Sequence, residues 1–335
     1  MTITPLWKAG FETGDLREFT STSGAIAVST TQKKTGTYAL RLNQSNNDYG
    51  DKTLATSQAR VGFHYYPTEN NTTTFEAFPF RFMNATTNLF GVAIDDSGTT
   101  MKMFVSGSVV ATATAPVYRV WQHWGLEWKA SATAGWAKLY IDGALILEYT
   151  GNTGSTAAAF VRVGGGTNGF QAYAYIDDIY VDDTTGESVA YPPPDKRFAW
   201  HVLAADVTKQ FTPSTGSDHY ALLDEVPVSA TDYVSTTAAG NVDTFTLTSV
   251  SYPAGFVVAA VWPTAEAFKS DGALDSRLTF RITDGVDTTD SATQALPTTV
   301  DVVTARFALQ PDGTPWDNAA VDSLTVGFVS SGDFV

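Results

Sequence analysis

The stretch 121–149 constrains the fold more than any other part of the chain. It runs Trp-Gln-His-Trp-Gly-Leu-Glu-Trp over 121–128, crosses a polar loop of Ser, Thr, Ala and Gly, and resumes as an alternating run from Trp136 through Asp142-Gly143. Alternation of apolar and polar residues is typical of half-buried strands. Asp-Gly readily takes the positive φ angles of a tight hairpin turn. The stretch therefore predicts a three-stranded antiparallel meander.

In residues and order, this stretch resembles part of the laminin-G-like and concanavalin-A-like jelly rolls, a fold used mainly for binding and for building surfaces. Carbohydrate-binding jelly rolls often begin with F-E-x-G and end with two acidic residues between apolar ones. The strings FETG (11–14) and IDDI (176–179) fit that pattern, and the resemblance covers residues 5–185. It implies that the first and last strands are neighbours and that three apolar side chains pack between them, namely Phe11, Ile176 and Ile179.

Most other segments also read as strands. Short alternating or β-branched runs such as 38–42, 89–94, 101–105 and 160–163 are separated by clusters of Gly, Ser, Thr, Asn and Asp. The best helical candidate is the stretch from Ala265 to Leu274, which is only about two turns long. The sequence predicts an all-β protein.

Length and composition predict two domains. A chain of 335 residues exceeds the usual single core, and its 43% hydrophobic content is ample for burial. The three prolines at 192–194 lock an extended polyproline segment, which is typical of a spacer between domains. We expect two β-sandwich, jelly-roll domains over 1–190 and 195–335, joined by a Pro-rich linker.

The second half resembles a domain of tailed-bacteriophage structural proteins. The pattern G-x-x-H-Y-x-h-h-D-E-x-P matches 216–227, D-Y-h matches 232–234, and G-T-x-W matches 313–316. The resemblance implies a tail or capsid-decoration component that is made in the bacterial cytoplasm and located in the virion. Other virion proteins are the implied partners, and a homo-oligomer is expected, most plausibly a trimer in a fibre or spike.

Charge and hydrophobicity exclude two classes of partner. The 35 acidic residues outnumber the 20 Lys and Arg, giving a net charge of −15 that repels nucleic acid and anionic lipid. The longest apolar run, 254–262, falls far short of a membrane-spanning helix. The chain has no cysteine and hence no disulfides, and its first residues do not form a signal peptide, which favours synthesis in the cytoplasm.

The jelly-roll resemblance also implies a structural calcium ion, because related sandwiches carry one where the first and last strands meet. The carboxylates of Glu12 and Asp177 would converge there, with backbone carbonyls completing an oxygen shell. A second interpretation fits the same residues: Glu12 caps a turn and Asp177 accepts hydrogen bonds from loop amides. No cofactor is expected to be required.

The sequence offers little support for catalysis. Jelly-roll glycosidases need two carboxylates close together on one strand face, and no E-x-D-x-E string occurs. Glu127 has Lys129 at the spacing where a second carboxylate would lie, so we expect an ion pair on a solvated strand face. The four histidines show no metal-binding spacing. His64 beside Tyr65 resembles the Tyr/His pair of jelly-roll polysaccharide lyases, and this stays as an alternative.

Aromatic residues offer candidates for sugar binding, since aromatic rings stack on pyranose faces. The strongest candidates are Tyr65, Tyr66, Trp121 and Trp136, with Tyr173 and Tyr175 also available. For any one of them, packing in the core is the alternative.

The sequence thus predicts a non-enzymatic virion structural protein of a tailed phage that presents a glycan-binding face for adhesion to the host. The alternative is a carbohydrate-binding module, or a polysaccharide lyase or glycosidase, acting on a cell-surface or extracellular polysaccharide. A bacterial surface adhesin is a further rival, although export and anchoring sequences are missing from the chain.

Overall fold

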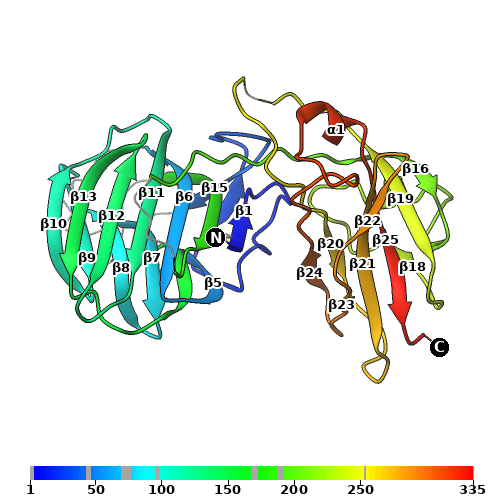
Figure 1. Cartoon of the computed structure of the whole chain (residues 1–335), viewed down its shortest axis with the longest axis horizontal. Coiled ribbons are helices and arrows are strands. Elements are labelled where there is room, and N and C mark those ends of the chain that lie inside the picture. The colour runs from blue at the N-terminus through cyan, green and yellow to red at the C-terminus, as the bar shows by residue number, and fades with distance from the viewer. Residues whose placement is uncertain are drawn as a thin grey trace. The chain divides into compact units, whose positions relative to one another are not determined.

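The structure, a computed structural model, describes residues 4–42, 47–68, 77–95, 98–166, 173–186, 192–252 and 254–334. Strands dominate both of its compact units, Met1–Phe198 and Ala199–Val335 (Figure 1). The all-β prediction is confirmed. The first unit ends at Phe198, eight residues beyond the predicted limit of 190. The difference arises because the prolines at 192–194 pack on the first unit, as described below.

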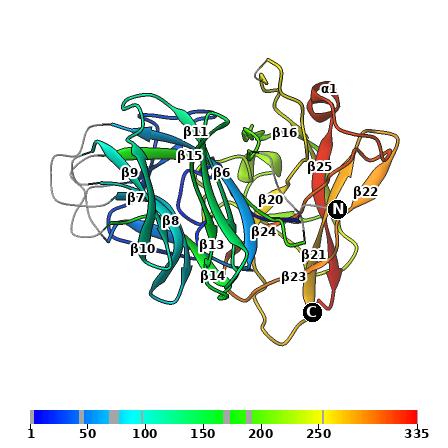
Figure 2. The ribbon, with the colours of Figure 1, turned by 60° about the vertical axis from the view of Figure 1, so that its left-hand side comes forward.

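The first unit is a sandwich of two antiparallel sheets (Figures 1 and 2). In spatial order, sheet A contains β13 (Ala144–Gly151), β12 (Gly135–Ile141), β11 (Gln122–Lys129), β6 (Gln58–Pro67), β15 (Ala174–Asp183), β4 (Ala39–Leu42) and β3 (Ala27–Ser29), and β1 (Thr4–Ala9) also pairs with β15. Sheet B contains β10 (Ser108–Thr114), β9 (Thr100–Val105), β8 (Thr87–Ile94), β7 (Ala77–Asn84), β14 (Ala158–Gly164), β5 (Tyr49–Thr56) and β2 (Ser21–Ser23).

The core lies between the two sheets because alternate residues of each strand point inward. Trp124 and Trp128 of β11 are fully buried, and the ring of Trp128 stacks on Phe82 of β7 with 5.1 Å between centroids. Burying each side chain of this size stabilises the fold by roughly 1.5–3 kcal/mol. The other residues of β11 therefore face away from the core, and they form part of the candidate site.

Two predictions about strand order in the first unit are confirmed. Strands β11, β12 and β13 form the predicted meander, and Asp142 and Gly143 take φ angles of 49° and 80° in the turn between β12 and β13. The first and last strands are neighbours, since β1 pairs with β15. The three side chains expected between them have no exposed surface, namely Phe11, Ile176 and Ile179.

The second unit is built on one larger antiparallel sheet. Its strands are β16 (Leu203–Thr208), β19 (Val242–Leu247), β25 (Thr325–Gly332), β21 (Ser276–Thr283) and β22 (Thr288–Asp290), with β23 (Gln294–Ala295) also paired to β21. Two short ladders accompany it, β17 (Thr212–Pro213) with β18 (Val234–Ser235) and β20 (Thr264–Ala267) with β24 (Asp301–Thr304). The short helices η1 (Tyr220–Leu222) and α1 (Asn318–Asp322) complete the described elements. A separate core around Phe280 and Trp316 holds the unit together.

The predicted helix over 265–274 is wrong. Its first residues belong to β20, where Glu266 pairs with Val302 of β24. Farther along, the backbone N–H of Lys269 donates to Pro297 O, so this part is also held by a distant segment. A two-turn helix is marginal by itself, and pairing with a partner strand overrides it.

The proline segment is docked on the first unit and does not serve as a free spacer. The ring of Pro193 covers Gly125 of β11, and the Tyr180 hydroxyl of β15 donates to Pro194 O at 2.6 Å. At the end of the segment, the Phe198 N–H donates to Asp178 Oδ1 at 2.8 Å. Residues 192–198, hereafter the strap, therefore belong to the first unit. The second unit is already ordered at His201, whose Nδ1 lies 2.7 Å from Thr248 O.

Candidate functional site

The outer face of sheet A carries the candidate site. Because side chains alternate along each strand, residues with one parity face the core and the others face outward. Register places the outward residues in rows across the sheet. Successive paired rows include Tyr66–Tyr175–Arg41, His123–His64–Asp177, Tyr140–Gly125–Gly62–Tyr180, Lys138–Glu127–Arg60–Asp182 and Trp136–Lys129–Gln58.

One end of this face is aromatic. The rings of Tyr66 and Trp121 lie 5.4 Å apart, and Tyr66 also contacts Tyr175 edge-on at 6.2 Å. Beside them, the Arg41 guanidinium lies 5.0 Å from the ring centroid of Tyr173, which is 42% exposed. Two sequence-predicted candidates, Tyr66 and Trp121, are thus neighbours on this face, together with the two additional tyrosines.

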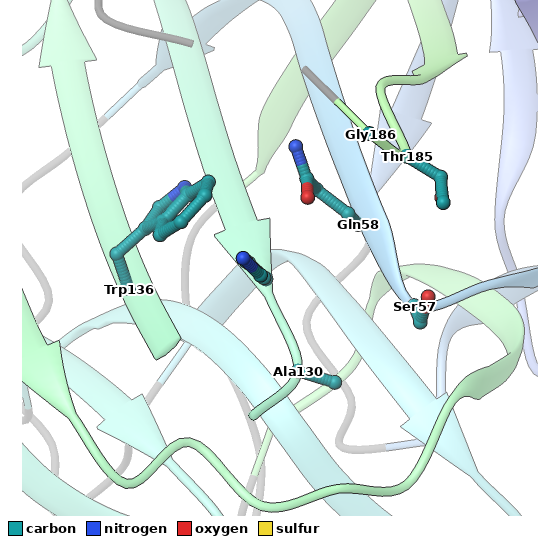
Figure 3. A pocket seen from close by; sticks show the side chains of 7 residues that line it. Ser57, Gln58, Ala130, Trp136, Thr185 and Gly186 are labelled. Carbon is teal, nitrogen blue, oxygen red and sulfur yellow. The ribbon is translucent and has the colours of Figure 1, made fainter. Parts of the chain in front are cut away.

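The opposite end holds a pocket of about 430 Å³, whose residues are drawn in Figure 3. It is lined by Ser57, Gln58, Lys129, Ala130, Trp136, Thr185 and Gly186. The Lys129 ammonium lies 4.6 Å from the centroid of the Trp136 ring, a cation–π contact. The Gln58 amide donates to Thr184 O at 2.7 Å, which fixes its orientation at the pocket wall. The pocket therefore combines one aromatic ring with amide, hydroxyl and ammonium groups.

Between the two ends, the face carries buried charges. Glu127 is 1% exposed, and burial raises the pKa of its carboxyl even though Lys138 and the Tyr140 hydroxyl act in the opposite direction. Asp182 is equally buried, and its carboxylate lies 3.4 Å from Arg60 Nη2. Burial leaves these groups inaccessible to a substrate in the structure.

The interpretation of Glu127 needs correction. We expected an ion pair with Lys129 on a solvated strand face. Instead Glu127 is buried, and the Lys129 ammonium lies over the Trp136 ring. The reason is that Glu127 lies between Lys138 of β12 and Arg60 of β6, which are its partners across the sheet and act on its carboxyl in place of Lys129.

His64 lies at the centre of the covered region. Its side chain is 1% exposed, with Nδ1 3.2 Å from Asp178 Oδ2 and Nε2 3.1 Å from Asp195 Oδ1 of the strap. Burial alone lowers the pKa of His64, but the two carboxylates outweigh it and hold that pKa above its ordinary value. Although burial opposes the shift, His64 and Arg197 hold the pKa of Asp195 well below its usual range. The charges of His64 and Asp195 thus stabilise each other.

The neighbouring His123 behaves differently. Its ring centroid lies 5.4 Å from that of His64, and burial, together with the His64 charge, lowers the pKa of His123 to about 4. His123 is therefore neutral at pH 7, while His64 binds a proton more readily. Although the two rings are close, the pKa of His64 is raised and that of His123 is lowered.

Glu12 and Asp177 hold one loop through its backbone. Glu12 accepts hydrogen bonds from the Thr37 N–H at 2.8 Å and the Tyr38 N–H at 3.0 Å. Asp177 Oδ2 accepts from the N–H groups of Lys34 and Thr35 at 2.8 and 3.1 Å, and its Oδ1 accepts from the next residue in the chain. These hydrogen bonds are the contacts that the second interpretation of Glu12 and Asp177 describes, and the calcium ion stays a proposal. Across the described ranges, no group of three or more His, Cys, Asp or Glu side chains is arranged to hold a metal ion.

The four sugar-binding candidates divide between the two faces of sheet A. Trp136, Tyr66 and Trp121 lie on the outer face. Tyr65 is 1% exposed in the core, where its ring meets Trp124 edge-on at 5.1 Å, so it is unavailable to a ligand. The alternation Val-Gly-Phe-His-Tyr-Tyr over 61–66 already favours an inward Tyr65, because Val61 and Phe63 share its parity.

Sequence reasoning missed Gln58, Lys129 and the strap. A signal for Lys129 was available, since pairing of the first two strands of the meander places it opposite Trp136. No local pattern indicates that the prolines lie on the sheet, because that contact joins residues far apart in sequence. Among the residues the structure describes, no helix is long and apolar enough to cross a membrane.

Solved structures match about half of the chain at low sequence identity. No family model matches the chain, and no curated protein matches it. Domain 4 of AbnA, a GH43 extracellular arabinanase from Geobacillus stearothermophilus in complex with arabinotriose, is 17% identical, with a TM-score of 0.37 over 55% of this chain and 94% of that chain. The carbohydrate-binding module CBM66 from Bacillus subtilis is 17% identical, with a TM-score of 0.33 over 49% and 99%.

A third structure, the cellulose-induced protein Cip1, is 10% identical, with a TM-score of 0.38 over 52% of this chain and 95% of that chain. One of these neighbours is a carbohydrate-binding module, and another is a domain of an arabinanase. At such identities and scores they give no basis for transferring a ligand or a reaction to this chain.

Proposed function

We propose that the first unit binds a glycan on the outer face of sheet A, with the Trp136 pocket as the primary site. The observation that carries the proposal is the composition of this pocket, in which one aromatic ring stands beside Gln58, Lys129, Ser57 and Thr185. Sugars offer an apolar ring face and a rim of hydroxyls, so they need both kinds of contact. The pocket volume of about 430 Å³ lies within the usual range for small-molecule sites.

The pocket favours binding without reaction. Its seven lining residues carry no carboxyl or imidazole group. Glycosidic hydrolysis by the common route needs two carboxyl groups that flank the bond. Glu127, the nearest carboxyl group in sequence to Lys129, is 1% exposed and does not line the pocket. We therefore propose that this pocket binds a glycan without catalysing a reaction.

A test compares Trp136→Ala with a matched control. The control is Trp262→Ala in the second unit, where a tryptophan also has a cation, Arg306, 5.9 Å from its ring centroid. Binding to arabinan, xylan, cellulose and polyuronate would be measured by affinity electrophoresis. We expect Trp136→Ala to lose about tenfold or more in affinity, corresponding to ~1.4 kcal/mol, with no change in the control. If the unmodified protein binds none of these polymers, the proposal fails.

The second candidate function is a structural role in a phage particle. It is favoured by the strings G-x-x-H-Y-x-h-h-D-E-x-P and G-T-x-W in the second half of the chain. In this arrangement the first unit would adhere to a cell-surface glycan, and the second would attach to other virion proteins, as a homo-oligomer. Co-purification with intact particles through a density gradient tests the assignment, which its absence from purified particles would reject.

A further inference from the structure

The strap crosses the outer face of sheet A from β11 to β15. Pro193 lies on Gly125 of β11, Asp195 contacts His64 of β6, and Lys196 Nζ lies 2.7 Å from Asp182 Oδ2 of β15. These contacts fall on successive strands of the sheet, so this part of the chain runs across the strand direction. The strap therefore occupies the middle of the face between its two ends.

Two glycines of sheet A leave space beneath the strap. Gly125 and Gly62 pair directly on neighbouring strands. A Cβ added to Gly125 would lie 2.8 Å from Pro193 Cδ, and one added to Gly62 would lie 2.3 Å from Tyr180 Cε1. Both distances are shorter than van der Waals contact. The two glycines thus form a shallow trough that the rings of Tyr180 and Pro193 fill.

Polar contacts hold the strap along its length. The Tyr180 hydroxyl donates to Pro194 O, the ammonium of Lys196 lies 4.0 Å from the Tyr180 ring centroid, and the Thr35 hydroxyl donates to Phe198 O at 3.3 Å. The Asp182 side chain is 1% exposed and contacts the Arg60 guanidinium. The Lys196 ammonium is therefore a second cation beside this buried carboxylate. Removing the strap would expose these groups to water and leave the His64 charge with one carboxylate fewer.

The strap separates two regions suited to sugars. Tyr66 at the aromatic end and Gln58 at the pocket end both belong to β6 and are eight residues apart, or about 26 Å along the strand. A glycan lying along the face from one end to the other would have to pass through the volume that Pro193 and Asp195 occupy.

We propose that the strap restricts each end of the face to a short glycan or to the end of a glycan chain, and that it excludes the continuous binding of a long polysaccharide. This inference rests on the proposed glycan-binding function. Pro193, Asp195 and Lys196 are then specificity-determining residues, although none of them lines the Trp136 pocket. Affinity is set by the sugars that fit at one end, and further units project into solvent.

The test releases the strap in the full chain. The double variant Asp195→Ala/Lys196→Ala removes the contacts with His64 and Asp182 without changing net charge. The matched control is Arg281→Ala/Asp290→Ala, which removes an ion pair of 2.7 Å from the second unit, also without changing net charge. Trypsin measures release, because Arg197 lies within the strap and becomes a faster cleavage site when the strap leaves the sheet.

Binding is then titrated by calorimetry with arabino-, xylo- and gluco-oligosaccharides and with oligouronates of two, four, six and eight units. In the unmodified protein and the control, we expect affinity to level off within twofold beyond four units. In the released variant, it should rise tenfold or more between four and eight units. If that double variant does not fold, Pro193→Gly serves instead, since it removes the Pro193 ring from the trough and keeps both charges.

The outcomes separate the two proposals. If affinity in the unmodified protein rises tenfold between four and eight units, the strap inference is overturned while glycan binding stands. If the unmodified and released proteins both bind no oligosaccharide, glycan binding fails and the inference fails with it. Binding that appears only after release would also overturn the inference, because the strap would then close the whole face instead of limiting each end to a short glycan.

Discussion

His64 Nε2 lies 3.1 Å from Asp195 Oδ1, and this contact joins the central strand of the outer face to the strap that covers it. On the other side of the ring, Nδ1 faces Asp178 of β15. A cationic imidazole between two carboxylates binds both more strongly than a neutral one does. Proton binding by His64 and docking of the strap are therefore linked, and this linkage contributes to the pH dependence of the first unit.

We predict that the first unit loses stability as the pH rises from 6.5 to 8, a range that lies above the titration of His123 and below that of Lys8, whose lowered pKa values act in the opposite direction. The pKa of His64 is raised in the folded state, so its contribution is complete below its unfolded pKa and is lost as the pH passes the folded one. Buried Glu18 acts in the same direction, since burial raises its pKa to about 7. Melting temperatures across this range check the prediction, and a flat or rising profile would contradict it.

A control separates His64 from the carboxyl groups. In Asp195→Asn, one charge beside His64 is lost, so the pKa of His64 should fall and the decline should begin at lower pH. Titration of the His64 ring by NMR reports this directly. An unchanged His64 titration in the variant would show that Asp195 does not contact the ring in solution.

We predict that Tyr180→Phe destabilises the first unit by about 1 kcal/mol. The variant keeps the ring that fills the trough and removes only the hydroxyl that donates to Pro194 O at 2.6 Å. Tyr149→Phe is the matched control, because its hydroxyl makes an exposed contact of 3.3 Å with Asn152 O. Urea denaturation measures both, and an equal loss in the two variants would argue against a docked strap.

We predict that a fragment 1–198 is more stable than a fragment 1–186. Both contain every strand of the first unit, but only the longer one retains the strap with its contacts to Asp178, Tyr180 and Asp182. The shorter fragment should melt at least several degrees lower, since ~1 kcal/mol shifts the melting temperature of a domain of this size by about 2–4 °C. Equal melting temperatures would mean that residues 192–198 do not stabilise the first unit and act only as a spacer.

The sequence predicted part of sheet A but not the strap that lies on its outer face. Alternation around Trp124 and Trp128 correctly predicted the meander, because period-2 patterning and the Asp-Gly turn are local properties. The position of the strap depends on a contact between Pro193 and Gly125. These residues are far apart in sequence, and no local pattern around either one predicts the contact. A proline run is equally compatible with a free spacer and with an extended segment whose carbonyls accept side-chain hydrogen bonds.

The sequence identified the carboxylates of Glu12 and Asp177 but not the groups that they contact, because those contacts also join residues far apart in sequence. The pairing of β1 with β15 brought Glu12 and Asp177 to one region, as the jelly-roll resemblance implied. Their hydrogen bonds go to the backbone of Lys34, Thr35, Thr37 and Tyr38, a loop that carries no sequence signature for this role.

We predict that Asp177→Ala destabilises the first unit in the presence and in the absence of calcium. Three backbone N–H groups lose their acceptor, and one of them, that of Asp178, is buried, so its unsatisfied donor alone costs about 1–3 kcal/mol. Melting with calcium or with a chelator should give the same temperature for the unmodified protein. If the chelator lowers that temperature and Asp177→Ala abolishes the difference, a calcium ion is held at this position after all.

The last prediction concerns the trough itself. Gly125→Ala places a methyl group 2.8 Å from Pro193 Cδ, and a clash of this kind typically costs about 1–3 kcal/mol. Because β11 is paired along both edges, with β6 and β12, the strap should shift before the sheet does. We therefore expect faster trypsin cleavage within the strap together with a modest loss of stability. Gly272→Ala is the control, since its added Cβ would meet only Thr298, at an ordinary 3.4 Å. Unchanged cleavage in Gly125→Ala would mean that Pro193 does not rest on β11 in solution.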